Sequence, residues 1–113
     1  MDRTARICAL NDAFRCGRGN APVFFTEFTI TSGVAAHGEE FVEGAMAAVV
    51  SYEDFSEDND PYGEHDFGAF DIDGQKLFWK IDYYGTDLKF GSPDPSDPSA
   101  TRRVLTILLA SEY

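Results

Sequence analysis

The stretch HDFGAFDIDGQKLFWKIDYY, residues 65–84, decides the fold of this chain. Two runs rich in aromatic and β-branched residues flank an Asp-Gly pair at 73–74, a strong short-range signal for a two-residue hairpin turn. A turn of this length fixes the register of the two strands. It places Gly68 opposite Trp79, where the glycine leaves room for the large indole.

Alternation along the two strands separates a core face from an outer face. On the outer face, Asp71 is expected to pair with Lys76 and His65 with Asp82, as oppositely charged or hydrogen-bonded neighbours. The residues expected to face the core are Phe70, Ile72, Leu77, Trp79, Ile81 and Tyr83.

Segments before the hairpin predict two helices and one further strand. Ile7, Leu10 and Phe14 recur at the spacing of an amphipathic helix. VFFTEFTIT, residues 23–31, is typical of a strand. Residues 37–52 carry the apolar stripe of a second helix, and a polar loop follows it.

The C-terminal segment completes the predicted fold. Asp and Pro at 97–98 form a favoured helix start, and the apolar residues within 104–109 predict a third helix. The predicted class is α+β in the order α-β-α-β-β-α, a small antiparallel β-sheet (hairpin 65–84 plus strand 23–31) with three helices packed mainly on one face. A length of 113 residues suits a single domain, 1–113.

Negative charge is concentrated in the middle of the chain. The 20 acids exceed the 9 Lys and Arg by 11, and the 57 residues between Arg18 and Lys76 hold 13 acids and no Lys or Arg. A protein this acidic repels nucleic-acid backbones and anionic membranes, so neither is expected as a direct partner. No apolar run approaches the roughly 20 residues of a membrane helix, and residues 1–14 lack the pattern of a signal peptide.

Nine of these acids lie within residues 53–73, where a dense ridge of carboxylates would imitate the phosphates of duplex DNA. We therefore expect a surface that binds a basic, nucleic-acid-handling protein. An alternative is a structural or regulatory interaction module whose acidity serves solubility. The expected partner-binding residues are Glu53, Asp54, Glu57, Asp58, Asp60, Glu64, Asp66, Asp71 and Asp73.

A second alternative is an enzyme. Glu64, His65 and Asp66 are consecutive, and Asp82 is predicted across the hairpin. A His–Asp pair can act as a base with the group that orients it, so a small hydrolase or metal-dependent enzyme would be centred on His65, Asp66 and Asp82. No nucleophile elbow, HExxH motif, phosphate-binding loop or dinucleotide fingerprint accompanies them.

Cysteine and histidine spacing predicts neither a disulfide nor a metal site. Cys8 and Cys16 lie eight positions apart on the predicted first helix, which separates their Cα atoms by about 12 Å of rise, beyond disulfide reach. With His37 and His65 they show no short pair spacing typical of zinc, so we expect no metal and no cofactor. Free thiols packed as small apolar groups indicate a reducing compartment.

The blocks NDPYGEHDFG (59–68), FWKIDYY (78–84) and DLKFGSPDP (87–95) resemble a family of small uncharacterised bacterial proteins, a domain of unknown function met on plasmids and other mobile elements. LNDAFR (10–15) and GVAA (33–36) are similar to it as well. The resemblance implies a cytoplasmic bacterial protein and supplies no activity. Its mobile-element setting, with the small size and the acidity, suggests by analogy a non-enzymatic anti-defence inhibitor. It would be anti-CRISPR-like or a DNA mimic, acting on a CRISPR or other nucleic-acid-processing complex.

Overall fold

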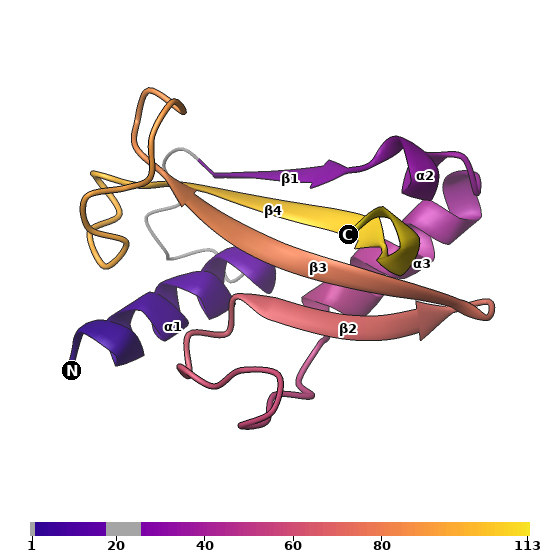
Figure 1. The fold of residues 1–113 in the computed structure, drawn as a ribbon, viewed down its shortest axis with the longest axis horizontal. Coiled ribbons are helices and arrows are strands. Elements are labelled where there is room, and N and C mark those ends of the chain that lie inside the picture. The colour runs from indigo at the N-terminus through magenta and orange to yellow at the C-terminus, as the bar shows by residue number, and fades with distance from the viewer. Residues whose placement is uncertain (1, 18–25) are drawn as a thin grey trace.

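The computed structural model describes residues 2–17 and 26–113, which form a four-stranded sheet with helices packed against it (Figure 1). The strand order across the sheet is β1-β4-β3-β2. This arrangement confirms the predicted α+β class. The elements are α1 (Arg3–Arg15), β1 (Thr26–Ile30), α2 (Ser32–Ala35), α3 (Glu39–Val50), β2 (Phe67–Ile72), β3 (Gln75–Tyr84), β4 (Arg102–Leu109) and the short 3-10 helix η1 (Ala110–Glu112).

Strands β2 and β3 form the predicted hairpin, and the predicted register is confirmed: Gly68 pairs with Trp79. The turn residues Asp73 and Gly74 have φ values of 50° and 78°, as a two-residue type I′ turn requires. A Cβ added at Gly68 would lie 2.7 Å from Cζ of Tyr52 and would also collide with the indole of Trp79. The absence of a side chain at position 68 is therefore a packing requirement.

The C-terminal segment is a strand, so the predicted helix beginning at Asp97 is wrong. Strand β4 lies between β1 and β3, parallel to β1 and antiparallel to β3, which makes the sheet mixed rather than antiparallel. Burial alternates along it, with Arg103, Leu105 and Ile107 buried, which is the two-residue period of a strand. Asp97 instead accepts hydrogen bonds from the amide and hydroxyl of Ser99 in a tight turn.

The predicted strand and second helix are confirmed with changed boundaries. Strand β1 covers residues 26–30, and positions 23–25 of the prediction lie outside the described residues. Helix α3 corresponds to the helix expected over 37–52. The four-residue helix α2 was not expected. It is capped by the Thr31 hydroxyl, which accepts from the Val34 amide.

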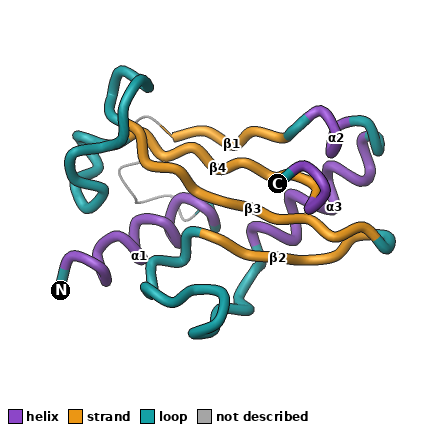
Figure 2. Tube along the Cα trace, viewed as in Figure 1, coloured by secondary structure: helices purple, strands orange, loops and turns teal. Residues whose placement is uncertain are grey.

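The core lies between the helices and one face of the sheet (Figures 1 and 2). Trp79 at the centre of β3 is fully buried, as its predicted place on the core face requires, and its cluster includes residues of α1, α2 and α3. On the other face, the ring of Tyr113 contacts Phe67 and Phe78 at centroid distances of 6.3 and 5.3 Å.

None of the helices in the described ranges combines the length and the apolar character needed to span a lipid bilayer.

Candidate functional site

The nine acids of the expected binding surface do not form one patch. Four of them, Glu53, Asp54, Glu57 and Asp58, are exposed on the segment between α3 and β2 (residues 51–66), which we call the acidic loop. Within the described ranges, no Lys, Arg or His forms an ion pair with these four carboxylates. They are therefore a group of uncompensated charges available to a partner.

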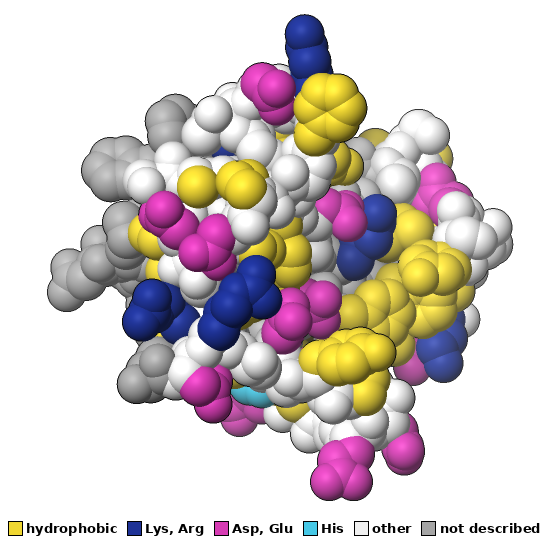
Figure 3. Space-filling view, turned by 60° about the vertical axis from the view of Figure 1, so that its left-hand side comes forward, with side chains coloured by type: hydrophobic (Ala, Val, Ile, Leu, Met, Phe, Trp, Pro, Cys, Tyr) yellow, Lys and Arg dark blue, Asp and Glu magenta, His cyan; other side chains and the backbone are white. Residues whose placement is uncertain are grey.

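The other five acids lie in different surroundings. Asp60 is buried and Glu64 is partly buried under the loop. Burial, and then the neighbouring charge of Glu64, raises the pKa of Asp66. Asp71 and Asp73 lie at the turn end of the hairpin. Figure 3 accordingly shows acidic and basic side chains interspersed on the face drawn, without a continuous acidic ridge.

Hydrogen bonds within the acidic loop fix its shape. The side chain of Asn59 accepts from the Ser56 amide at 2.9 Å and donates to the Asp54 carbonyl at 2.8 Å. The Asp60 amide donates to the Ser56 carbonyl at 2.8 Å. The loop also presents Tyr62, which is 80% exposed. Its outer surface is thus a fixed arrangement of carboxylates and one aromatic ring.

Asp60 holds the backbone of the acidic loop, and His65 attaches the loop to the body of the protein. Oδ1 of Asp60 accepts from the amides of Glu64 and His65 at 3.1 and 3.2 Å. His65 has a φ of 55°, a left-handed conformation that interrupts the approach to β2. Its ring stacks on Phe55 with the centroids 3.7 Å apart and the planes 2° from parallel.

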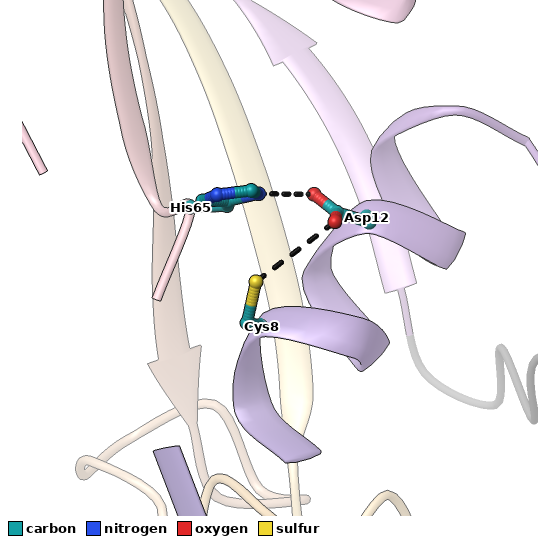
Figure 4. Close-up of side chains that lie close together, drawn as sticks. All are labelled: Cys8, Asp12 and His65. Atoms are coloured by element: carbon teal, nitrogen blue, oxygen red, sulfur yellow. Dashed lines mark hydrogen bonds and ion pairs between the residues drawn. The ribbon is translucent and has the colours of Figure 1, made fainter. Parts of the chain in front are cut away.

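Helix α1 supplies the main partner of His65 (Figure 4). The Nδ1 atom of His65 lies 2.8 Å from Oδ1 of Asp12, and its Nε2 atom lies 3.6 Å from Oδ2 of Asp60. Both ring nitrogens therefore face carboxylates. In this arrangement neither nitrogen is placed to take a proton from a substrate, which disfavours His65 as a metal-free general base.

The alternative catalytic group His65, Asp66 and Asp82 is not brought together as expected. Pairing between β2 and β3 ends at Phe67 and Lys80, because the left-handed His65 leaves the strand path, so the expected His65–Asp82 pair is wrong. Asp82 instead forms an ion pair with Lys80 at 2.9 Å.

The Cys8 thiol lies beside the Asp12–His65 pair and donates to Oδ2 of Asp12 at 3.9 Å. Burial, and then the negative charges of Asp12 and Asp60, raises the pKa of Cys8 to about 11. The thiol is therefore protonated at neutral pH and is a poor nucleophile in this state. Cys8 and Cys16 are both free, as expected.

A pocket of about 430 Å³ opens between α1 and the acidic loop. Its walls include Asp12, Arg15 and Cys16 from α1, and Phe55 and His65 from the loop. This volume is within the range of small-ligand pockets. The stacked rings and the polar groups of α1 therefore border a space open to solvent.

A buried polar network lies next to this pocket. Asn11 donates to Oη of Tyr83 at 2.7 Å and to the Glu64 carbonyl at 3.0 Å, and it accepts from Nε of Arg103 at 2.7 Å. Tyr83 donates to the Glu64 carboxylate at 2.9 Å. Burial raises the pKa of Tyr83 and lowers that of Arg103. The network joins α1, the acidic loop, β3 and β4.

Sequence reasoning missed the contribution of α1 to this site. Asn11 lies between Ile7 and Phe14 on the apolar stripe, and a polar residue within such a stripe is a signal for a buried hydrogen-bonding role. Cys8 and Asp12 are i,i+4 neighbours on a helix and therefore adjacent in space. Nothing local indicated that His65 would be their third partner.

Comparison with known proteins places part of the chain in a described family. A family model described as "Protein of unknown function (DUF3768)" matches residues 30–112. The matched range contains the acidic loop, His65 and strands β2, β3 and β4, whereas α1 and nearly all of β1 lie before it. No curated protein and no solved structure matches the chain. The expected likeness to a domain of unknown function is thereby confirmed.

Proposed function

The chain belongs to the DUF3768 family, whose function is unknown, so we propose a function from the site itself: a non-enzymatic binding module that docks on a basic surface of a nucleic-acid-handling protein. The observation that carries this proposal is the group of exposed carboxylates on the acidic loop, which no Lys, Arg or His of residues 2–17 and 26–113 pairs with. Four such charges within six positions, 53–58, make this the densest run of acids in the sequence, and all four are exposed.

Electrostatics and rigidity both favour such docking. A formal charge of −11 attracts basic partners over a distance and raises their rate of encounter. The hydrogen bonds of Asn59 and Asp60 hold the loop in one shape, which lowers the entropy lost when a partner orders it further.

Tyr62 gives the loop a place for apolar contact. Its side chain is 80% exposed although its neighbours in the loop are fixed. Tyrosine is enriched among the residues that dominate binding energy at interfaces, because its ring buries a large area and its hydroxyl bonds to polar groups. We expect Tyr62 to enter a hollow of the partner while the carboxylates contact its Lys and Arg.

The biological form that we propose is inhibition in the bacterial cytoplasm. A groove that binds phosphates would accept carboxylates in their place, and a bound acidic loop would exclude the nucleic acid. The natural target would then be a CRISPR or other nucleic-acid-processing complex, with this chain acting as an anti-defence protein.

Binding to purified targets at several salt concentrations tests this function. The full chain is immobilised and offered a CRISPR effector nuclease, a restriction endonuclease and a nucleoid protein. Each is tested at roughly 50, 150 and 500 mM NaCl, which takes electrostatic screening from weak to strong. We expect at least one to bind, to bind more weakly at high salt, and to release its nucleic acid. Failure of every target to bind at the lowest salt would count against the proposal.

A charge-matched pair of variants separates a docking surface from general acidity. Neutralising the loop should weaken binding at least tenfold, and Tyr62→Ala should weaken it further. A control variant that removes an equal number of negative charges outside the loop should leave affinity within twofold. Equal losses in both would instead support acidity that serves solubility. The loop variant is E53Q/D54N/E57Q/D58N, and the control is E39Q/E40Q/E43Q/D73N, all at exposed positions.

A further inference from the structure

Three donor atoms of different kinds converge beside the pocket: Sγ of Cys8, a carboxylate oxygen of Asp12 and a ring nitrogen of His65 (Figure 4). All three lie within 4.8 Å of one another. We propose that these residues bind one divalent transition-metal ion, with zinc as the best fit. The site goes beyond the proposed docking function and is independent of it.

The distances between the donors are close to those around a tetrahedral zinc ion. Zinc bonds of about 2.0–2.3 Å at tetrahedral angles place ligand atoms roughly 3.3–3.8 Å apart. Here Nδ1 of His65 is 2.8 Å from Oδ1 of Asp12, and Sγ of Cys8 is 3.9 Å from Oδ2 of the same carboxylate. One oxygen of Asp12 would bind the ion, so the Asp12–His65 hydrogen bond must open and the three side chains must rotate when the ion enters.

A second observation comes from the far side of the imidazole. Metal-bound histidines usually donate their other N–H to a carboxylate, which orients the ring and makes it a stronger ligand. Oδ2 of Asp60 lies 3.6 Å from Nε2 of His65, and the Asp60 side chain is only 5% exposed. Backbone amides of the loop hold this carboxylate in position. Asp60 thus occupies the place of the outer carboxylate in a carboxylate–histidine–metal arrangement.

Charge and donor type agree with this choice of metal. A Cys8 thiolate and the Asp12 carboxylate would neutralise a doubly charged ion. Sulfur and imidazole nitrogen favour zinc and its neighbours over the oxygen-seeking Ca²⁺ and Mg²⁺. On binding, the thiol proton passes to solvent.

Three protein ligands leave a fourth coordination position. In zinc proteins this is the pattern of sites that hold a water or an exogenous ligand, whereas structural sites use four protein ligands. Asp12 and His65 both line the 430 Å³ pocket. The fourth position would therefore be accessible from the pocket to water or to a small ligand with an anionic oxygen.

Metal titration of the reduced, chelator-treated full chain tests the site. We expect one equivalent of Zn²⁺ by mass spectrometry of the metal content, and a thiolate-to-cobalt charge-transfer band when Co²⁺ replaces it. Zn²⁺ should also protect Cys8 of the wild-type protein from alkylation while Cys16 keeps its reactivity. This readout needs no substitution, so it stays informative if a variant fails to fold.

The second Cys and the second His provide matched controls. Cys8→Ser and His65→Gln should lower Zn²⁺ affinity at least a hundredfold, and Asp60→Asn should lower it about tenfold. Cys16→Ser and His37→Gln should leave affinity within twofold. The proposal is overturned if the wild type binds less than a tenth of an equivalent, lacks the charge-transfer band, or loses affinity equally when Cys16 is replaced.

Discussion

Arg103 of β4 donates its Nε–H to Oδ1 of Asn11 in α1 at 2.7 Å, across 92 positions of sequence, and both residues are at least 97% buried. The guanidinium also donates to the Pro95 carbonyl and lies 5.3 Å from the ring of Tyr83. A buried cation held by neutral oxygens and a ring is stable while these partners remain, because an unpaired buried charge is costly. The end of the chain is thereby fixed to its first helix.

Asn11→Ala should therefore destabilise the protein by about 3 kcal/mol in urea unfolding, because it leaves the buried Arg103 charge with the Pro95 carbonyl alone as a hydrogen-bond acceptor. The double variant Asn11→Ala/Arg103→Met should lose less stability than the sum of the two single variants, because the second substitution removes the buried charge that the first leaves under-bonded. Arg6→Met at an exposed position of α1 should change stability by less than about 0.5 kcal/mol. Strictly additive losses in the double variant would contradict this reading of the pair.

Gly68→Ala should destabilise the hairpin by about 2–3 kcal/mol, because the new methyl group would overlap the Trp79 indole and the Tyr52 ring. Gly44→Ala is the matched control. Gly44 lies within α3 and its nearest neighbour is 4.0 Å from the added Cβ, so alanine should stabilise the protein by up to about 1 kcal/mol. Thermal unfolding of both variants checks the pair, and equal effects would rule out the packing argument.

Arg15→Lys should destabilise the protein by about 2 kcal/mol in urea unfolding although it keeps the charge. The buried Arg15 guanidinium donates to the carbonyls of Val49 and Tyr52 at 2.7 and 2.9 Å, where α3 ends and its carbonyls lack helical partners. It also lies 5.2 Å from the Trp79 ring. A lysine ammonium has one nitrogen, so it cannot keep both the carbonyl bonds made by Nη1 and the 3.3 Å bond from Nη2 to Asp12. Arg6→Lys, at an exposed position, should be neutral, and a similar loss there would refute the explanation.

Glu112→Gln should lower Tm by a few degrees at pH 7 and by less as the pH falls. The hydroxyl of Thr31, then the amides of Leu109 and Gly33, lower the pKa of Glu112 from its usual 4.5. A lowered folded-state pKa adds stability above about pH 4.5, and this stability is lost as the pH falls through the folded value. Melting curves from pH 7 to pH 3 check the trend. Glu40→Gln, on the exposed surface of α3, should show none of it.

The hairpin was predictable because its signals are local. The turn residues at 73–74 set the register, and the alternation of residues 67–72 and 75–84 sets the two faces without reference to the rest of the chain. The apolar segment at 104–109 carried no such local constraint. A short apolar run does not by its period distinguish a buried strand from a buried helix, and pairing with both β1 and β3 made it a strand.

The site was predictable in part. The exposed acids at 53–58 follow from composition, since consecutive charged residues in a polar loop stay in water. The placement of His65 does not follow, because its ring partner Asp12 is 53 positions away. Cys8 joins the same cluster from one helical turn before Asp12. His65 and the Glu64 carbonyl, which bond to Asp12 and Asn11, hold the loop against α1, and this contact assembles the cluster.

The amino-acid sequence by itself determined the acidic character of the central segment, helices α1 and α3, and the register of the hairpin. Each depends on neighbours within a few positions, through turn conformation, side-chain period or solvation. The tertiary structure alone decided that the last segment is the inner strand β4 and that His65 meets Cys8 and Asp12. Both outcomes depend on contacts between residues more than 50 positions apart in the sequence. Such contacts form only when the helices pack on the sheet around the Trp79 core.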